Sequence, residues 1–333
     1  RALLRPASKG MNDGPIPNLD ALMEIAERLH IVGQQDARMA AAEPGDLIRN
    51  VAGKRAIFEG VFEGRDVVFR LNYHPEEGAP AREWAEMERL WPYMAEGDLR
   101  IAEPIYANAG AGVIVLERVS GTPMLTLMRR LEAHERVAFF APAARWLHQS
   151  TAMTDAARVA GTAGWLRRAG AASEKQPFPA LRALEVQILE QMARLAPHID
   201  SEVWRTAICH GDFHPNNLIV DGARITGIDI GGSTRMPIYK DMARFLIHIG
   251  RRRIEASGAR ALGVDLAGLR AFAEVFALEA NERAVILPFF LAFEALIRVE
   301  IRALPKWRIK AAEAMYRDLL TDLQRTGPGA PLF

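Results

Sequence analysis

The sequence predicts an α+β protein with two lobes, a small one built on an antiparallel sheet and a larger one built from helices. Its 333 residues are more than a typical single domain holds, so two lobes are the expected organisation. Between residues 47 and 119 the apolar runs are short and have the pattern of strands. From residue 125 to about residue 324 the apolar pattern is mostly that of helices. We therefore expect a β-rich lobe over residues 1–118 and a helical lobe over residues 119–333.

The composition is that of a globular protein in a reducing compartment. Half of the residues are hydrophobic and a quarter are charged, which is ordinary for a chain with a large core. The formal net charge of +1 argues against a nucleic-acid partner held by electrostatics. The single cysteine excludes an internal disulfide framework. The first residues are not apolar enough for a signal peptide and charges interrupt the apolar stretch 284–301, so we expect a cytoplasmic protein without a membrane partner.

The elements of the first lobe follow from these patterns. Glycines and prolines predict a loose leader over residues 1–17, and residues 50–55 form a small basic loop between strands. The other expected elements are a helix at 19–31, a hairpin of strands 56–62 and 67–71 around a turn at 63–65, a helix at 81–90, and strands at 101–106 and 113–119.

In the second lobe the pattern is mostly helical. Residues 153–175 are rich in Ala, Gly and Thr and predict a loop with short helices, residues 231–234 predict a flexible segment, and Arg251–Arg253 predict a solvated helix end. The expected helices are 125–131, 136–150, 181–195, 289–302 and further ones up to about residue 324.

The chain is organised around residues 210–217, His-Gly-Asp-Phe-His-Pro-Asn-Asn, and the hairpin that follows them. Two apolar strands flank Asp221–Gly222, which predicts a tight turn with positive φ. With these two residues as the loop, counting outward places His214 opposite Asp229. The hairpin therefore returns Asp229 to the neighbourhood of the motif.

Three oxygen-bearing side chains are thereby expected together: Asp212, Asn217 and Asp229. Hard oxygen ligands of this kind suit Mg²⁺, which is usually held by one or two protein groups together with phosphates. Phosphoryl transfer uses one Asp to orient an incoming hydroxyl and accept its proton, and an Asn and an Asp to hold the metal. We assign Asp212 as the catalytic residue, and Asn217 and Asp229 as metal ligands.

Three stretches, residues 210–217, Ile228–Asp229 and Tyr239–Ala243, resemble in order and spacing the signature of the aminoglycoside phosphotransferase and choline kinase superfamily. The resemblance implies a protein-kinase-like fold and an enzyme that phosphorylates a small molecule, with Mg²⁺ as cofactor and ATP, or alternatively GTP, as the donor. It also implies that Asp241 braces the catalytic loop through hydrogen bonds. An ordinary acidic residue in the first turn of a helix is the other interpretation of Asp241.

The same resemblance implies nucleotide contacts in the first lobe. Arg70 lies where the family's strand-three cation, commonly Lys, contacts phosphates, and Glu83 lies where the partner of that cation is found, with Glu86 as the second choice. Lys54 in the basic loop would reach a phosphate, or else it belongs to a solvated turn. Backbone groups from Glu117 to Val119, at the expected hinge between the lobes, would meet the adenine.

The acceptor is expected to be a hydroxyl group of a small molecule. The family builds its acceptor pocket from C-terminal helices, and Glu294, Arg298 and Arg302 form a charged stripe on one of them. This stripe lines the pocket or forms a structural ion pair. An aminoglycoside would need an acidic pocket, and the second half of the chain has no acidic tract. The sequence carries no signature of an oligomeric state.

Other chemistries are open to the same residues. His210 and His214 have the spacing of a zinc pair on a helix, but Gly211 and Pro215 disfavour a helix there. Cys209 beside His210 suggests a nucleophile and its base. Adjacent side chains in an extended segment point to opposite faces, however, which favours a buried structural cysteine.

A non-catalytic module is the alternative function. A kinase-like protein that binds a nucleotide or metabolite without transferring phosphate would explain Arg70 in place of the usual Lys. The complete set of Asp212, Asn217 and Asp229 favours the enzyme.

Overall fold

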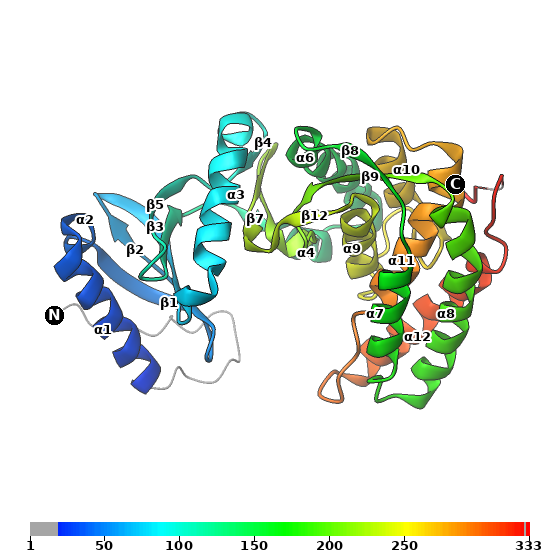
Figure 1. The fold of residues 1–333 in the computed structure, drawn as a ribbon, viewed down its shortest axis with the longest axis horizontal. Helices are drawn as coiled ribbons and strands as arrows, with labels where there is room; N and C mark the ends of the chain where they lie inside the picture. The colour runs from blue at the N-terminus through cyan, green and yellow to red at the C-terminus, as the bar shows by residue number, and fades with distance from the viewer. Residues whose placement is uncertain (1–18, 330) are drawn as a thin grey trace. The chain divides into compact units, whose positions relative to one another are not determined.

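The computed structural model describes residues 19–329 and 331–333, so the leader expected at residues 1–17 lies outside the described residues. The chain divides into two compact units (Figure 1). The first holds the described residues up to Ser120 together with Ile228–Gly231, and the second holds the described residues of Gly121–Gly227 and Gly232–Phe333. The predicted α+β class, with a sheet-based N-terminal part and a helical C-terminal part, is confirmed. The separate roles expected for residues 1–118 and 119–333 stay predictions.

A five-stranded antiparallel sheet forms the centre of the first unit. Its strands follow the order β1 (Glu43–Val51), β2 (Arg55–Phe62), β3 (Arg65–Asn72), β6 (Val113–Glu117) and β5 (Pro104–Asn108). The β2–β3 hairpin closes at Glu63 and Gly64, whose φ angles of 51° and 77° are both left-handed. The hairpin predicted around residues 63–65 is therefore confirmed.

Different helices cover the two faces of this sheet (Figure 1). α1 (Leu19–Gln35) and the short α2 (Ala37–Ala40) pack over one face and share a large buried core with it. α3 (Ala79–Met94), which leads to the short β4 (Leu99–Ile101), packs over the other face. Successive residues of a strand point to opposite faces. Phe69 therefore faces α1 within the core, and its neighbour Arg70 faces α3.

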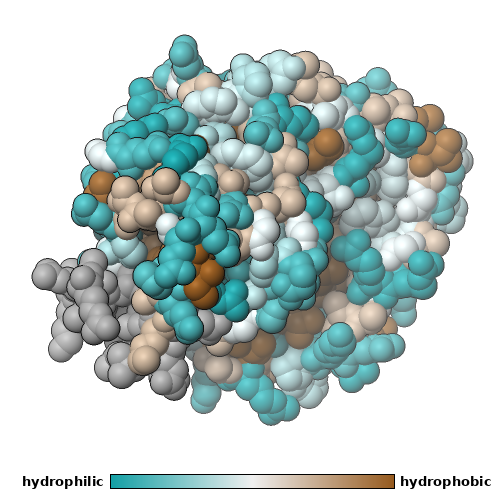
Figure 2. All heavy atoms as spheres, turned by 60° about the vertical axis from the view of Figure 1, so that its left-hand side comes forward, coloured by the Kyte–Doolittle hydropathy of each residue, from teal (hydrophilic) through white to brown (hydrophobic). Residues whose placement is uncertain are grey.

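Hydrophilic side chains cover most of the surface drawn in Figure 2, which brings the first unit forward, and the hydrophobic ones form small separate groups. Exposed large hydrophobic residues of this unit include Ile31, Ile48 and Tyr93. Scattered side chains of this kind are normal on a globular protein. Within the described part of the chain, no helix combines the length and the apolar character needed to cross a bilayer.

Helices packed around small sheets make up the second unit. They are α4 (Met124–Arg130), α5 (Ala133–Arg136), α6 (Phe140–Ala152), α7 (Ala163–Ser173), α8 (Pro179–Asp200), α9 (Tyr239–Gly250), α10 (Leu266–Val275), α11 (Leu287–Leu296) and α12 (Lys306–Leu323). Figure 1 shows α7, α8, α11 and α12 side by side. α11 is buried along its whole length and also packs against α9, which makes it the centre of this core.

Two small sheets position the motif residues 210–217. β9 (Val203–Cys209), which ends directly before the motif, pairs with β8 (Ala156–Val159) and β12 (Thr234–Pro237). After the motif, β10 (Leu218–Asp221) pairs with β11 (Arg224–Gly227) and with β7 (Thr122–Pro123). A further ribbon joins β13 (Arg260–Ala261) to β14 (Val264–Asp265). The motif thus connects two sheets of the second unit.

The hairpin after the motif forms, but its register differs from the predicted one. Asp221 pairs with Arg224, so the two-residue loop is Gly222–Ala223 and lies one residue further along the chain than expected. The positive φ falls on Gly222 (60°), the residue that adopts it without strain. The predicted pairing of His214 with Asp229 is therefore wrong, and β11 ends before Asp229 is reached.

Two segments expected to be irregular are ordered by tertiary contacts. Residues 153–175 contain β8 and α7, and Trp165 of α7 packs edge-to-face on Phe290 and Phe293 at centroid distances of 5.1 and 4.8 Å. Residues 231–234 lead into β12, which pairs with β9 along its whole length. The local sequence of both segments is weakly patterned, and packing against the rest of the unit decides their structure.

The predicted helix 289–302 ends early, and the cluster Arg251–Arg253 is not simply solvated. α11 stops at Leu296, so the expected stripe does not extend to Arg302, which is exposed. Arg251 is buried, and its Nη2 donates to the carbonyl oxygen of Ala295 at 3.0 Å. The guanidinium thus satisfies a carbonyl at the end of α11 that has no partner within the helix.

Candidate active site

The loop that follows β9 carries the motif, and the start of α9 holds it in place. Gly211 has a φ of 83°, and a Cβ at this position would lie 2.4 Å from the carbonyl oxygen of Gly232, so only glycine fits. Its N–H donates to Asp241 Oδ2 at 3.0 Å, and Lys240 Nζ donates to its carbonyl oxygen. Asp241 therefore braces the loop, as the resemblance implied.

An aromatic stack anchors the same loop in the core. Phe213 is fully buried, and its ring stacks on Trp146 and Phe245 at centroid distances of 5.6 and 5.3 Å. Gly227 leaves room for the stack, because a Cβ there would lie 1.9 Å from the Trp146 ring. The stack limits the backbone movement of the residue before Phe213, which is Asp212.

The Asp212 side chain is 44 % exposed and contacts three basic side chains. Arg244 Nε donates to Oδ1 at 2.9 Å, Arg298 Nη2 donates to Oδ1 at 3.2 Å, and His214 Nε2 lies 3.4 Å from Oδ2. Burial alone would raise the pKa of Asp212, but the hydrogen bond with His214 and the charges of Arg244 and Arg298 bring it well below its usual range. The carboxylate is therefore ionised at neutral pH and able to accept a hydrogen bond from a hydroxyl.

Asn217 lies close to Asp212 because the loop curls. It ends the short 3₁₀ turn Pro215–Asn217 and is buried. Its Nδ2 donates to the carbonyl oxygen of Asp212 at 3.0 Å. With the amide nitrogen engaged in this way, the carboxamide oxygen is the atom that can bind a cation.

In the first unit, Arg70 of β3 is buried between two carboxylates. Its Nη1 lies 2.5 Å from Glu83 Oε1 of α3, and its Nη2 lies 2.9 Å from Asp229 Oδ1. Burial raises the pKa of Glu83, and the charge of Arg70 opposes this shift. Glu86 instead pairs with Arg89 on its own helix, so Glu83 is the helix residue that orients the Arg70 guanidinium.

Asp229 has a strained backbone and a half-exposed side chain. Its φ of 61° is left-handed, a conformation that costs a non-glycine residue about 1 kcal/mol, although Asp tolerates it better than most. Arg55 Nη1 lies 3.5 Å from its Oδ1, in addition to the contact with Arg70. Strain of this kind is often kept where a side chain must point in one direction for function.

The remaining residues expected at the nucleotide site lie on the same unit. Lys54 is exposed in the turn between β1 and β2. Glu117 ends β6, and its side chain binds Arg100 and the N–H of Glu103. Val119 follows in the irregular segment after β6. Because the Glu117 side chain is engaged, this segment offers mainly backbone groups to a ligand.

The donor chemistry fits Mg²⁺ better than a transition metal. In the part of the chain that the structure describes, no group of three or more His, Cys, Asp or Glu side chains is arranged to hold a metal ion. Mg²⁺ commonly uses only one or two protein oxygens and takes the rest from phosphates and water. The carboxylate of Asp229 and the carboxamide oxygen of Asn217 are of this type. Cys209 is buried and burial raises the pKa of its thiol, so it is the structural cysteine that was predicted.

Three arginines that contact Asp212 or Asp229 were not predicted as site residues. Arg244 lies three residues after Asp241 on α9, so both face the loop, and this spacing could have indicated it. Arg298 was expected only as part of a helical stripe, because the end of α11 was not predicted. Arg55 was counted with the basic loop and instead starts β2.

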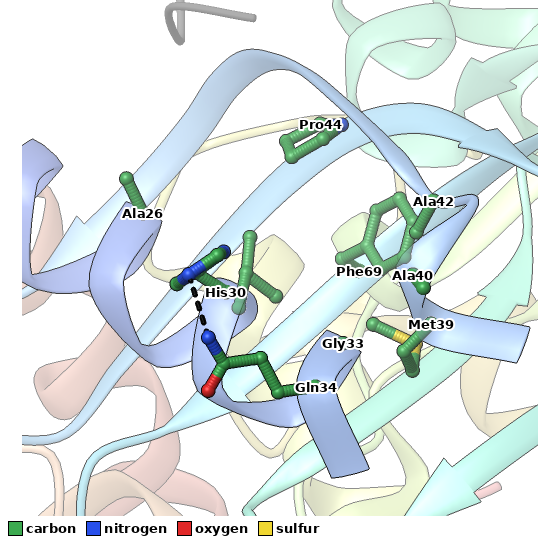
Figure 3. Close-up of a pocket in the computed structure, with 10 residues that line it drawn as sticks. Ala26, His30, Gly33, Gln34, Met39, Ala40, Ala42, Pro44 and Phe69 are labelled. Carbon is green, nitrogen blue, oxygen red and sulfur yellow. Dashed lines mark hydrogen bonds between the residues drawn. The ribbon is translucent and has the colours of Figure 1, made fainter. Parts of the chain in front are cut away.

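A separate cavity of about 480 Å³ lies on the α1 face of the first unit (Figure 3). α1, α2 and β1 line it together with Phe69, and His30 and Gln34 at its edge are joined by a hydrogen bond of 3.0 Å. Since Phe69 and Arg70 point to opposite faces of the sheet, this cavity includes none of the predicted site residues.

Comparisons with known proteins agree with the motifs. The family model described as "Phosphotransferase enzyme family" matches residues 59–284. No curated protein sequence matches the chain. Similar solved structures include a provisionally assigned aminoglycoside phosphotransferase from Ralstonia eutropha JMP134, with 18% identity over 91% of this chain and 99% of that chain and a TM-score of 0.59.

Two further structures have the same fold. One is an amicoumacin kinase in complex with AMP-PNP, Ca²⁺ and Ami, with 13% identity over 90% of this chain and 96% of that chain and a TM-score of 0.57. The other is a choline/ethanolamine kinase family protein from Mesorhizobium loti, with 16% identity over 91% of this chain and 99% of that chain and a TM-score of 0.52. Since the family model spans more than half of the chain, the chain belongs to the phosphotransferase enzyme family and is a small-molecule phosphotransferase, as its motifs predicted.

Proposed function

We propose that the chain transfers the γ-phosphoryl group of ATP to a hydroxyl group of a small molecule. The pairing of Asp212 with Asn217 carries this proposal. An ionised, half-exposed carboxylate and a carboxamide lie on one loop, and the carbonyl oxygen of Asp212 accepts a hydrogen bond from Asn217 at 3.0 Å. In phosphotransferases, such a pair orients the acceptor hydroxyl and binds the metal.

The first unit would bind the nucleotide. Arg70 would contact phosphate oxygens with a guanidinium that Glu83 orients. Lys54, exposed on its turn, would add a mobile positive charge, and backbone groups from Glu117 to Val119 would meet the base. The similar structure that contains AMP-PNP and Ca²⁺ supports a nucleotide and a divalent cation here, with ATP as the donor and GTP as the alternative.

Asn217 and Asp229 would hold Mg²⁺ through their side-chain oxygens. When bound, the ion neutralises the negative charge of the nucleotide phosphates. Asp229 is paired with Arg70 and Arg55, so the cation would bind to its carboxylate beside these two guanidinium groups.

In the reaction, the acceptor oxygen forms a bond to the γ-phosphorus while the bond to the β–γ bridging oxygen breaks, which releases ADP. Asp212 accepts the hydrogen bond of the hydroxyl and then its proton. Because the pKa of Asp212 lies well below its usual range, it is a weak base, and it receives the proton late, after the new bond has made the hydroxyl acidic. Its main contribution is therefore orientation of the acceptor.

An Asp212→Asn variant tests this assignment. We expect acceptor-dependent ADP release to fall by about 10²- to 10⁴-fold, while the Kd for Mg-ATP stays close to that of the wild type. Asp221→Asn is the matched control, because Asp221 is an exposed residue at the end of β10, and it should keep full activity. Equal turnover in the Asp212 variant would remove Asp212 from the reaction.

The metal assignment has its own test. Asp229→Ala should weaken binding of Mg-ATP but change binding of ATP in EDTA much less, because the lost group contacts the cation. Isothermal titration calorimetry with and without EDTA measures both. Equal losses under the two conditions would show that Asp229 is not a metal ligand.

A non-catalytic nucleotide-binding module remains the second candidate. Two observations favour it: Arg70 stands in place of the usual Lys, and two arginines donate hydrogen bonds to the Asp212 carboxylate. Tight binding of Mg-ATP without turnover across a broad panel of hydroxyl compounds would establish it. Turnover of any member that is lost in Asp212→Asn would exclude it.

A further inference from the structure

Basic side chains from three elements gather on one side of the second unit. Arg244 and His248 are four residues apart on α9, so they lie on one helix face, and Arg252 follows in the turn after the helix. Arg298 follows directly after α11, and Arg308 lies in the first turn of α12. We call Arg244, Arg252, Arg298 and Arg308 the arginine cluster.

The members of the arginine cluster are close enough to affect one another. Burial and the charge of Arg298 lower the pKa of Arg244. Burial and the charges of Arg308, Arg129 and Arg244 lower the pKa of Arg252. Arg244 and Arg298 also contact the same atom, Asp212 Oδ1, at 2.9 and 3.2 Å, so the arginine cluster lies beside Asp212.

Carboxylates do not balance this charge. Asp212 contacts Arg244 and Arg298, and Glu294 lies 3.6 Å from Arg298. Within residues 19–329 and 331–333, no carboxylate forms an ion pair with Arg252 or Arg308. Glu294 is also shared with Lys240. The arginine cluster therefore has an excess of positive charge, which buried or half-buried sites rarely keep without an anion.

Several nitrogen atoms in the same region have no acceptor. The Nε atoms of Arg252 and Arg308 are buried and make no hydrogen bond to any described residue. Both ring nitrogens of His248 also make no hydrogen bond to any described residue, although the residue is only 4 % exposed and its ring packs against His214 at a centroid distance of 4.5 Å. Buried polar atoms are normally paired, so these nitrogens point to a ligand rich in acceptor oxygens.

We infer that the phosphoryl acceptor is an anion, a hydroxylated compound with a carboxylate or phosphate group that binds the arginine cluster while its hydroxyl meets Asp212. This inference rests on the proposed function and names its substrate class. Arg298 links the two parts, since its guanidinium already lies 3.2 Å from Asp212 Oδ1 and its side chain is 35 % exposed. On binding, the guanidinium would exchange part of this contact for the oxygens of the acceptor.

The inference distinguishes this chain from a phosphotransferase that acts on a cationic compound. A protonated amine placed beside the arginine cluster would meet an excess of like charge in a poorly solvated region. An anion of the same shape would meet charge-assisted hydrogen bonds, each of which is worth about tenfold to a hundredfold in affinity.

A matched series of acceptors tests the preference. Glycerol, glycerate, glycerol 3-phosphate and 3-amino-1,2-propanediol share a vicinal diol and differ in charge. We expect kcat/KM for acceptor-dependent ADP release to be at least about tenfold higher for the best anionic member than for glycerol, and lowest for the amine. A preference for glycerol or for the amine would overturn the inference and leave the proposed phosphotransferase intact.

A binding experiment gives an answer even if none of these compounds is turned over. Inorganic phosphate should raise the unfolding temperature of the wild type, because ligands that bind the folded state stabilise it. Arg308→Gln and Arg298→Gln should lose this rise. Lys310→Gln, which removes one exposed charge from the same helix α12, should keep it. A rise that survives in both cluster variants, or no rise in the wild type, would overturn the inference.

Discussion

The buried ion pair between Arg70 and Glu83 allows a prediction with a magnitude. Glu83→Gln keeps the shape of the side chain and removes its charge. The side chains of the pair are only 4 % and 5 % exposed, and removal of one partner from a buried pair typically costs about 3–5 kcal/mol. Arg70 keeps a second carboxylate, Asp229, at 2.9 Å. Burial also raises the pKa of Glu83, which favours the neutral form that Gln mimics and offsets part of this cost. We therefore expect a loss below this range, about 2 kcal/mol of unfolding free energy.

Glu86→Gln is the matched control for this prediction. Glu86 lies on the same helix and pairs with Arg89, but these side chains are 10 % and 23 % exposed, so its loss should cost no more than about 1 kcal/mol. Urea unfolding followed by circular dichroism measures both variants. A cost for Glu83→Gln no larger than that for Glu86→Gln would refute the reasoning.

The same pair predicts a dependence on pH. Burial raises the pKa of Glu83 above its usual value, so between these two values the folded protein binds more protons than the unfolded chain. The contribution of this group to stability therefore falls as pH rises through that window, and Glu83→Gln should remove this slope. Because Glu83 also orients Arg70, the KM for ATP should rise in the variant, and an unchanged KM would contradict the positioning role.

Three further outcomes follow from the structure. The pKa of Asp212 is lowered, so its ionised form should persist below pH 5. A plot of kcat/KM against pH should therefore show no fall on the acidic side between pH 5 and 8 that is caused by protonation of Asp212. A fall in that range that Arg244→Gln shifts would contradict this. Gly211→Ala would place a Cβ 2.4 Å from a carbonyl oxygen and should lower both stability and kcat, whereas Gly222→Ala, at a φ of 60° with open space, should cost only about 1–2 kcal/mol and leave kcat unchanged. Phe213→Ala should cost about 3–5 kcal/mol in thermal or urea unfolding, because it empties a fully buried stack.

Much of the local structure could be predicted because it depends on short-range patterns. The hairpin around Glu63–Gly64 and the helix with Glu83 follow from periodicity and from residues that favour turns. The motif at residues 210–217 identified the family, and its five-residue spacing brought Asp212 and Asn217 together as expected. These features depend on residues close in sequence.

The features that could not be predicted depend on contacts between distant segments. The loop of the hairpin after the motif lies one residue further along the chain than predicted. The sequence alone does not determine its position, since both Asp221–Gly222 and Gly222–Ala223 allow a tight turn. The ends of α11 and the ordering of α7 are set by packing within the second unit. Arg244 on α9 and Arg298 after the end of α11 reach Asp212 from 32 and 86 residues away in the chain, and no local pattern predicts such an approach.

The four residues Ile228–Gly231 belong to the first unit although they lie within the sequence of the second. The polypeptide therefore passes from one unit to the other three times, and no single cut separates them. A fragment that stops at Ser120 would lack Asp229 and leave Arg70 with one carboxylate instead of two. Recombination that exchanges a terminal segment between related genes would break this pairing. The two units are therefore expected to be inherited together, and acceptor specificity to diverge by point substitution within the second unit.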